Sequence, residues 1–422
     1  MNDMSGKIAP QSASASPNND SKCDGPLRIA IFSGNYNYVV DGPVRALNTL
    51  VAHLEHRGHD VLVFAPTVKN PPVAHNGELI AIPSVPFPGS RSEYRIGLGL
   101  FGAAKKRLDA FAPDVIHIAA PDLTGLQALK YAEEHALTPV ASFHTRFDTY
   151  LRYYGLKRLE KYVTNYMRRF YSRCQHVYAP SPSMRDELAA DRIGQDVRIW
   201  ARGVDSALFS PEKRDLAWRR ANGISDDSVV VLFVGRVVLE KGIDVFAEAL
   251  TQAAQSNNEN GHKTVIGLIV GEGPERERFQ QKLPDAVFTG FQEGQNLARA
   301  YASADVFFNP SVTETFGNVT LEAMASGLPT VAVAAAGSRS LVEDGKTGLL
   351  APLETDKGAR AMAYAQKLRA LADQPDLRAT MAKNARQKAL EFNWEAVLDG
   401  LIANYHSAMA DRNEKLQCDK KL

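Results

Sequence analysis

Long apolar runs and an excess of charge of either sign are missing from these 422 residues. No run of about 18 apolar residues occurs, so no segment is long enough to span a bilayer. Residues 1–25 are rich in Ser, Asn, Ala and Pro without an apolar stretch, which argues against a signal peptide and predicts a disordered tail. The net charge is +1, from 49 basic and 48 acidic residues, so we expect no nucleic-acid partner.

Cysteine and closely spaced acidic residues are also scarce. Cys23, Cys174 and Cys418 are far apart and form no metal-ligand pattern, so we expect a reducing compartment, the cytoplasm. The sequence Asp-x-Asp does not occur, although enzymes that hold a diphosphate through Mg²⁺ or Mn²⁺ usually show closely spaced acids. We therefore expect neither a bound metal nor another cofactor.

Short β-rich runs alternate with helical stretches from residue 27 onward. The first series of expected strands comprises residues 27–33, 60–65, 114–119, 139–143 and 176–180. A helix is expected over about 43–57, after the first strand. Such alternation implies parallel sheets with right-handed crossovers, and a chain of this length predicts two domains.

A second series of strands follows a polar stretch. Its members are residues 228–236, 264–271, 286–290, 305–311 and 330–334. The boundaries that we expect are a tail over 1–25, a first domain over 26–204, a linker over 205–226, a second domain over 227–391, and a C-terminal helix and tail over 392–422 that can pack back on the first domain. Two such domains facing each other form a cleft, and ligands bind at the carboxyl ends of the strands.

The strongest motif is PSVTETFGNVTLEAMASGLP. Glu314 lies on the loop after a predicted strand, and Gly317 opens a helix that carries Glu322, so the two carboxylates can reach different parts of one ligand. Backbone N–H groups of Phe316, Gly317 and Asn318 at the helix N-terminus suit a phosphate. Two solvated acids would be the ordinary interpretation of either Glu alone, but the combined pattern favours a ligand site.

A second motif, VGRVVLEKG, places two cations at a strand-to-helix turn. Arg236 and Lys241 are five residues apart, so a planar fork and a point charge can converge on one diphosphate. Negative charge grows on a departing nucleotide diphosphate, and fixed cations stabilise that transition state more than the ground state. The alternative is a pair of ordinary surface cations.

Other candidates follow strands at the expected cleft. His144 comes directly after one strand, a position where a lone histidine is more often structural than catalytic. Gly42 precedes a helix and allows close approach of a phosphate or sugar, and Asp41 beside it is a candidate for contacting the acceptor. Gly271 supplies a further turn before a helix, and Phe291 lies in the segment TGFQEG.

These motifs, in this order, resemble family-4 glycosyltransferases, whose signature is a Glu–seven residues–Glu segment. The resemblance covers nearly everything from Leu27 to Met409 and implies the α/β GT-B fold, in which two Rossmann-like parallel-sheet domains face a central cleft. The segments HTRFDTYLRYYG and ETFGNVTLEAMASG are most similar to bacterial lipid-directed α-mannosyl-, glucosyl- and glucuronosyltransferases and to sulfoquinovosyltransferases. Many members have paired glycines in the first loop, whereas this chain has only Gly34 and Gly42.

The resemblance also implies roles for single residues. Glu322 would bind the donor ribose, while Glu314 and His144 would contact the donor sugar near the reacting carbon. Arg236 and Lys241 would hold the diphosphate. The full donor-binding set that we expect is Gly42, Arg236, Lys241, Gly271, Phe291, Phe316, Gly317, Asn318 and Glu322.

One basic segment, residues 151–173, has seven basic residues against one acid, with aromatic residues at helical spacing. A basic amphipathic helix of this kind favours an anionic lipid interface, where each cation contributes roughly 1 kcal/mol. Packing of its apolar face into the first domain is the alternative. The candidate membrane residues are Lys157, Arg158, Lys161, Arg168 and Arg169.

The function that we predict is transfer of a hexose from a UDP- or GDP-sugar to a lipid acceptor, with retention implied by the resemblance. The enzyme would be cytoplasmic and peripheral on the inner face of the membrane. Three alternatives remain: a nucleotide-sugar epimerase of the same fold, a glycosyltransferase acting on a soluble or polysaccharide acceptor, and a non-catalytic nucleotide-binding protein.

Overall fold

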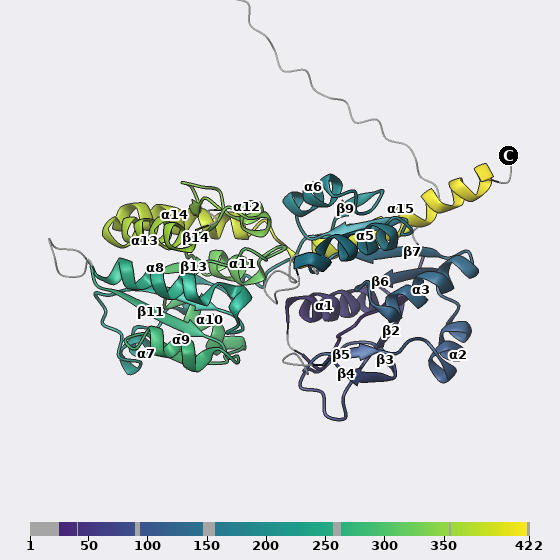
Figure 1. Ribbon diagram of the computed structural model, residues 1–422, viewed down its shortest axis with the longest axis horizontal. Coiled ribbons are helices and arrows are strands. Elements are labelled where there is room, and N and C mark those ends of the chain that lie inside the picture. The colour runs from purple at the N-terminus through teal and green to yellow at the C-terminus, as the bar shows by residue number, and fades with distance from the viewer. Residues whose placement is uncertain are drawn as a thin grey trace, which may run out of the picture.

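The computed structural model describes residues 25–39, 41–88, 93–146, 157–255, 263–353 and 356–419. It contains two α/β domains side by side, each built on a parallel sheet (Figure 1). The tail predicted over 1–25 lies outside the described residues except for Gly25, and so does the side chain of Lys157.

The first domain contains a seven-stranded parallel sheet in the order β3-β2-β1-β6-β7-β8-β9. Its strands are β1 (Arg28–Phe32), β2 (Asp60–Ala65), β3 (Glu78–Ala81), β6 (Val115–Ile118), β7 (Thr138–Ser142), β8 (His176–Ala179) and β9 (Val197–Ile199). A two-stranded antiparallel hairpin, β4 (Ser84–Pro86) and β5 (Arg95–Gly97), is separate from this sheet. The helical elements are α1 (Gly42–His56), α2 (Gly102–Phe111), α3 (Leu123–Glu134), η1 (Lys157–Leu159), α5 (Glu160–Tyr171) and α6 (Pro182–Ala190).

The second domain contains a six-stranded parallel sheet in the order β12-β11-β10-β13-β14-β15. Its strands are β10 (Val229–Val234), β11 (Val265–Val270), β12 (Val287–Gly290), β13 (Val306–Asn309), β14 (Thr330–Val333) and β15 (Gly348–Ala351). Its helical elements are η2 (Pro211–Lys213), α7 (Leu216–Ala221), η3 (Leu239–Lys241), α8 (Ile243–Gln255), α9 (Arg276–Lys282), α10 (Gly294–Ala302), α11 (Asn318–Ala325), α12 (Ala336–Leu341), α13 (Lys357–Asp373) and α14 (Pro375–Ala389).

Both sheets are buried on both faces, which explains why their central strands are continuous apolar runs. Along β1, Ile29 and Ile31 face one core cluster while Ala30 and Phe32 face the other. The same alternation occurs along β10. Helices on both faces therefore leave the carboxyl ends of the strands as the place where loops can form a site.

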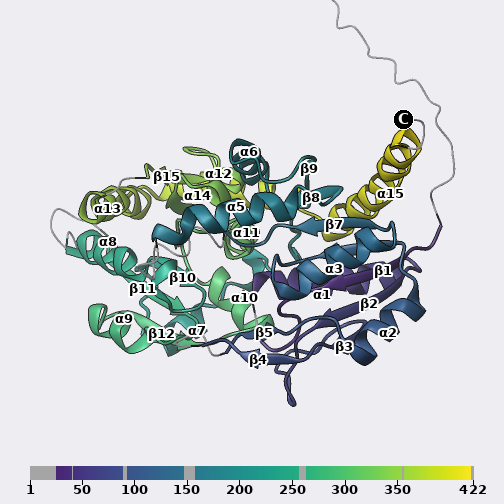
Figure 2. The ribbon, with the colours of Figure 1, turned by 45° about the vertical axis from the view of Figure 1, so that its right-hand side comes forward.

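The last helix, α15 (Trp394–Asp419), crosses back from the second domain to the first (Figures 1 and 2). Its Leu398, Leu401 and Tyr405 are buried in the cluster that includes Ile31 of β1. The crossing segment is bonded to the segment that leaves the first domain, because the Val204 N–H donates to the Phe392 carbonyl (3.0 Å). The helix therefore covers one face of the first sheet.

The stretch 205–226, which the sequence suggests as a linker, packs as part of the second domain. Within α7, the fully buried Arg219 donates to Asp305 at 3.0 Å and to the Ser303 carbonyl at 3.1 Å. Phe209 and Ile224 belong to a core cluster of that domain. Composition alone indicated a linker because this stretch is polar. Its Arg219 is nevertheless buried, in an ion pair with Asp305.

Candidate functional site

A pocket of about 360 Å³ lies between the domains, at the carboxyl ends of both sheets. The first domain contributes the start of α1 and the loop after β7, and the second contributes the loops after β10, β11, β12 and β13. The structure brings together every residue that the sequence predicted for catalysis, donor binding or acceptor contact. These lining residues are Asp41, Gly42, His144, Arg236, Lys241, Gly271, Phe291, Glu314, Phe316, Gly317, Asn318 and Glu322.

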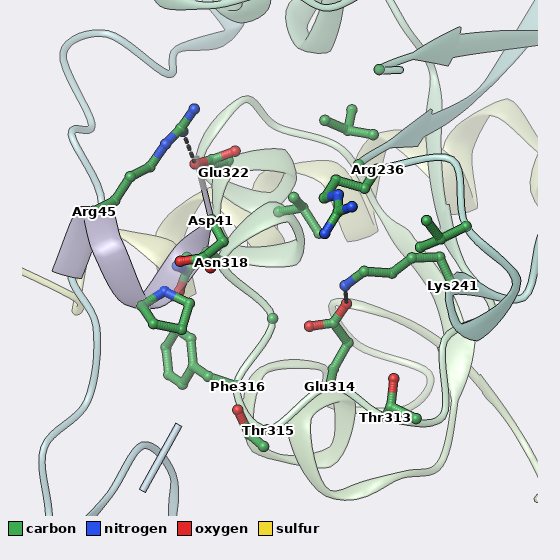
Figure 3. Close-up of a pocket in the computed structure, with 18 of the residues that line it drawn as sticks. Asp41, Arg45, Arg236, Lys241, Thr313, Glu314, Thr315, Phe316, Asn318 and Glu322 are labelled. Atoms are coloured by element: carbon green, nitrogen blue, oxygen red, sulfur yellow. Dashed lines mark hydrogen bonds and ion pairs between the residues drawn. The ribbon is translucent and has the colours of Figure 1, made fainter. Parts of the chain in front are cut away.

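The two cations after β10 are each bonded to a carboxylate. Lys241 Nζ lies 2.6 Å from Glu314 Oε1, across the floor of the pocket (Figure 3). Arg236 Nη2 lies 2.9 Å from Oε1 of Glu93, and its Nη1 lies 3.2 Å from the Tyr94 hydroxyl. Both of these partners of Arg236 belong to the first domain. An entering diphosphate would therefore compete with carboxylates for both cations.

Helix α11 presents its N-terminus and a half-buried carboxylate to the same space. Gly317, its N-cap, has a φ of 99°, in the left-handed region that favours glycine, and it offers no side-chain cap. One turn further on, Glu322 accepts a hydrogen bond from the Tyr301 hydroxyl (2.9 Å) and lies 3.9 Å from Arg45 Nη1 (Figure 3). Burial raises the pKa of Glu322, and Arg45 acts in the opposite direction.

Helix α1 meets α11 end to end. It begins at Gly42, where an added Cβ would lie 3.0 Å from Nδ2 of Asn318, so a larger residue would push the Asn318 side chain aside. Asp41 is the N-cap, and its carboxylate accepts from the Val44 N–H (2.9 Å) and from Asn35 Nδ2 (3.2 Å). Burial raises the pKa of Asp41, while the Val44 N–H lowers it. Its carboxylate thus caps helix α1, in addition to the acceptor contact that we predict.

The loops after β10 and β11 touch backbone to backbone. Gly271 has a φ of 140°, and a Cβ on it would collide with the carbonyl oxygen of Gly235. This approach holds the loop that carries Arg236 beside the one after β11. Phe291 follows β12 at the rim, and it is 52% exposed.

His144 follows β7 and is fixed on both ring nitrogens. Its Nδ1 accepts from Arg202 Nη2 (2.9 Å), and its Nε2 lies 2.8 Å from Ser142 Oγ. Burial is the main cause that lowers the pKa of His144 well below its ordinary value, and Arg202 adds to it. The His144 carbonyl accepts from the Thr315 hydroxyl of the second domain (2.9 Å). The imidazole is therefore held by a hydrogen bond at each ring nitrogen.

Comparison with known proteins agrees with this arrangement. The model for "Glycosyltransferase Family 4" matches residues 40–208, and the model for "Glycosyl transferases group 1" matches residues 228–374. A GDP-mannose-dependent alpha-mannosyltransferase of Mycolicibacterium smegmatis is 35% identical over 396 residues, which are 92% of this chain and 99% of the relative. The chain belongs to glycosyltransferase family 4.

Two further matches extend the comparison of this glycosyltransferase. An alpha-monoglucosyldiacylglycerol synthase of Streptococcus pneumoniae is 28% identical over 336 residues, which cover 77% of this chain and 75% of the relative. The solved sucrose-phosphate synthase of Thermosynechococcus elongatus superposes with a TM-score of 0.75 at 22% identity, covering 91% of this chain and 99% of that one. The family and the GT-B fold expected from the sequence are thus confirmed, while the roles of single residues remain predictions.

The pocket residues that the sequence prediction of this glycosyltransferase missed include Arg45, Tyr94 and Arg202. Arg45 lies one helical turn after Gly42, so helical spacing could have indicated it. Arg202 follows β9, a three-residue strand that the apolar pattern did not reveal. Nothing in the sequence around Tyr94 indicates a site.

Proposed function

We propose that this glycosyltransferase moves a hexose from a nucleotide-diphosphate sugar to a lipid acceptor with retention of configuration, without a metal ion. The observation that supports it is the pocket itself, in which Arg236 and Lys241 lie opposite two helix N-termini. Together these groups offer positive charge to a diphosphate from both domains. In our proposal the half-buried Glu322 accepts hydrogen bonds from ribose hydroxyls.

Among the described residues, one group of three potential metal ligands occurs, and it lies outside the pocket. It consists of His176, Asp196 and Asp411. Arg198 donates to both carboxylates at 2.9 and 3.1 Å, so a guanidinium already neutralises them. In our proposal Arg236 and Lys241, and not a metal ion, neutralise the departing diphosphate.

A lipid acceptor is supported by the relatives and by the surface of the first domain. One relative is named alpha-monoglucosyldiacylglycerol synthase, and the name of another specifies GDP-mannose. On the hairpin, Val85, Phe87, Ile96 and Leu98 share one face and are 37–45% exposed. Tyr94 of the same hairpin lines the pocket, so an apolar surface adjoins the site. None of the helices among residues that the structure describes is long and apolar enough to cross a bilayer.

The proposal is tested by incubating the protein with labelled GDP-mannose, UDP-glucose or UDP-glucuronic acid, with and without vesicles that contain diacylglycerol or a glycosyl-diacylglycerol. The expected result is label in the lipid fraction from one donor, undiminished by EDTA, with an α-linkage by NMR. Interconversion of a donor without lipid would indicate the epimerase instead. Loss of transfer with EDTA would contradict the metal-free mechanism.

A further inference from the structure

A continuous chain of hydrogen bonds runs from the pocket to the C-terminal helix. Arg202 Nη2 donates to His144 Nδ1 at 2.9 Å, and His144 Nε2 lies 2.8 Å from Ser142 Oγ. Ser142 Oγ lies 2.9 Å from His117 Nε2, and His117 Nδ1 lies 2.5 Å from the hydroxyl of Tyr405. Ser142 is on β7, His117 on β6 and Tyr405 on α15.

Every member of this chain except the half-buried His144 at the pocket is buried. Arg202 is 4% exposed, Ser142 is 1% exposed, and His117 and Tyr405 are fully buried. Trp200 holds the rings together, because the Arg202 guanidinium stacks 4.4 Å above it and both histidines meet its ring edge to face. A buried polar group that loses its partner destabilises the fold, so each bond of the chain constrains the next.

The arginine determines the direction of the first two bonds of the chain. A guanidinium only donates, so Nδ1 of His144 must accept and its proton lies on Nε2. That N–H donates to Ser142 Oγ, which is also hydrogen-bonded to Nε2 of His117. The other ring nitrogen of His117, Nδ1, is hydrogen-bonded to the Tyr405 hydroxyl. The opposite order would place an N–H of His144 against the N–H groups of Arg202.

We propose that Tyr405, His117 and Ser142 are positioning residues that hold the ring and tautomer of His144 against the donor sugar. The inference rests on the proposed function in that His144 is expected to contact the sugar. With both nitrogens engaged, His144 orients the sugar as a rigid neutral group and carries no proton in the reaction. Helix α15 thereby becomes part of the active site without lining it.

The chain offers a matched pair of substitutions. Tyr405→Phe removes the hydroxyl at the far end of the hydrogen-bond chain, the one bonded to His117. Tyr178→Phe removes the hydroxyl of a neighbouring buried tyrosine, which has no hydrogen-bond partner among the described residues and whose ring lies 6.1 Å from that of Tyr405. Each change removes one tyrosine hydroxyl from the same core cluster. A difference between the two variants is therefore caused by the hydrogen-bond chain and not by packing.

The experiment measures the nitrogen shifts of histidine in ¹⁵N-labelled protein, together with kinetics. We expect the Nε2–H tautomer for His144 and a single neutral tautomer for His117. In Tyr405→Phe both histidine signals should change and kcat should fall roughly 10- to 100-fold, with the KM of the donor little changed. Tyr178→Phe should match the unaltered protein in all of these measurements.

Unchanged His144 signals and equal kcat in the two variants would overturn the proposal. If Tyr405→Phe does not fold, Ser142→Ala breaks the chain one bond from His144 and leaves α15 intact. Its His144 signals must then change if the proposal holds. The tautomers can be measured without any substrate, so absence of transfer in the unaltered protein would count against the proposed function alone.

Discussion

At the scale of single residues, both cations of the pocket form ion pairs. Lys241 pairs with Glu314 and Arg236 with Glu93, and the first pair is the closer one. We predict that Lys241→Ala lowers kcat/KM by roughly 30- to 1,000-fold. This corresponds to about 2–4 kcal/mol of transition-state stabilisation, the effect of losing one charge-stabilising donor. The measurement is steady-state transfer at saturating acceptor.

The control for this change is Lys282→Ala. Lys282 forms an equally short ion pair, 2.6 Å from Asp244, but it lies on the surface away from the pocket. An exposed pair contributes about 0–1 kcal/mol to stability, so activity should be nearly unchanged. Equal activity of both variants would remove Lys241 from the mechanism.

Residues that line the pocket were easier to predict than the residues that hold them in place. Glu314, Glu322, Arg236 and Lys241 follow predicted strands, and parallel topology alone brings those loops to one edge. The partner of Arg236 is Glu93, which is 143 positions away and belongs to the other domain. No local pattern predicts such a contact, because it depends on how the domains face each other.

At the scale of elements, helix α5 packs one face into the first domain and leaves other residues exposed, so the membrane interpretation of its basic sequence stays a prediction. Met167 and Phe170 are buried in the first-domain core, whereas Tyr162 is 72% and Leu159 47% exposed. Arg168 is bonded into the protein, since its Nε donates to the Asp191 carbonyl at 2.6 Å. The cations available to a membrane are therefore the exposed ones: Arg158, Lys161 and Arg169.

We predict that Lys161→Glu with Arg169→Glu weakens binding to anionic vesicles by about 30-fold or more. Each cation near an anionic surface contributes about 1 kcal/mol, and the introduced carboxylates add repulsion. Co-sedimentation with phosphatidylglycerol vesicles at physiological ionic strength measures the effect. As a control, Lys263→Glu with Lys383→Glu reverses two exposed lysines of the second domain. Similar losses in both double variants would show a net-charge effect without a specific face.

Element boundaries show where apolar patterns lose information. All ten strands expected from apolar runs are present, most of them within one or two residues of the predicted ends. The missed strands are β3, β9 and β15 and the β4–β5 hairpin. Their residues are mostly half-buried or exposed, so they lack a continuous apolar run. Strands at the sheet edges need their neighbours before they can be recognised.

At the scale of the whole molecule, the first domain buries several histidines in neutral form, and this makes its folding sensitive to acid. Burial lowers the pKa of His117 to about 3, with Arg202 adding to the effect, and it lowers the pKa of His144 well below the ordinary value. Below pH 6.5 the unfolded chain therefore binds protons that the folded chain does not. Their contribution to stability is fully present above that pH and is lost as the pH falls.

We predict that His117 alone reduces the free energy of unfolding by about 1 kcal/mol between pH 6.5 and pH 5.5, because a shift from 6.5 to about 3 leaves the folded group neutral throughout this window. Urea unfolding followed by circular dichroism at the two pH values measures the loss. In His117→Asn the loss should be smaller by that amount, whatever the absolute stability of the variant. His56→Asn, at the exposed end of α1, should keep the full loss.

The comparison between variants matters because carboxyl groups such as Glu322, whose pKa is raised by burial, change the free energy of unfolding with the opposite sign. An identical loss in His117→Asn and in the unaltered protein would contradict the lowered pKa of His117.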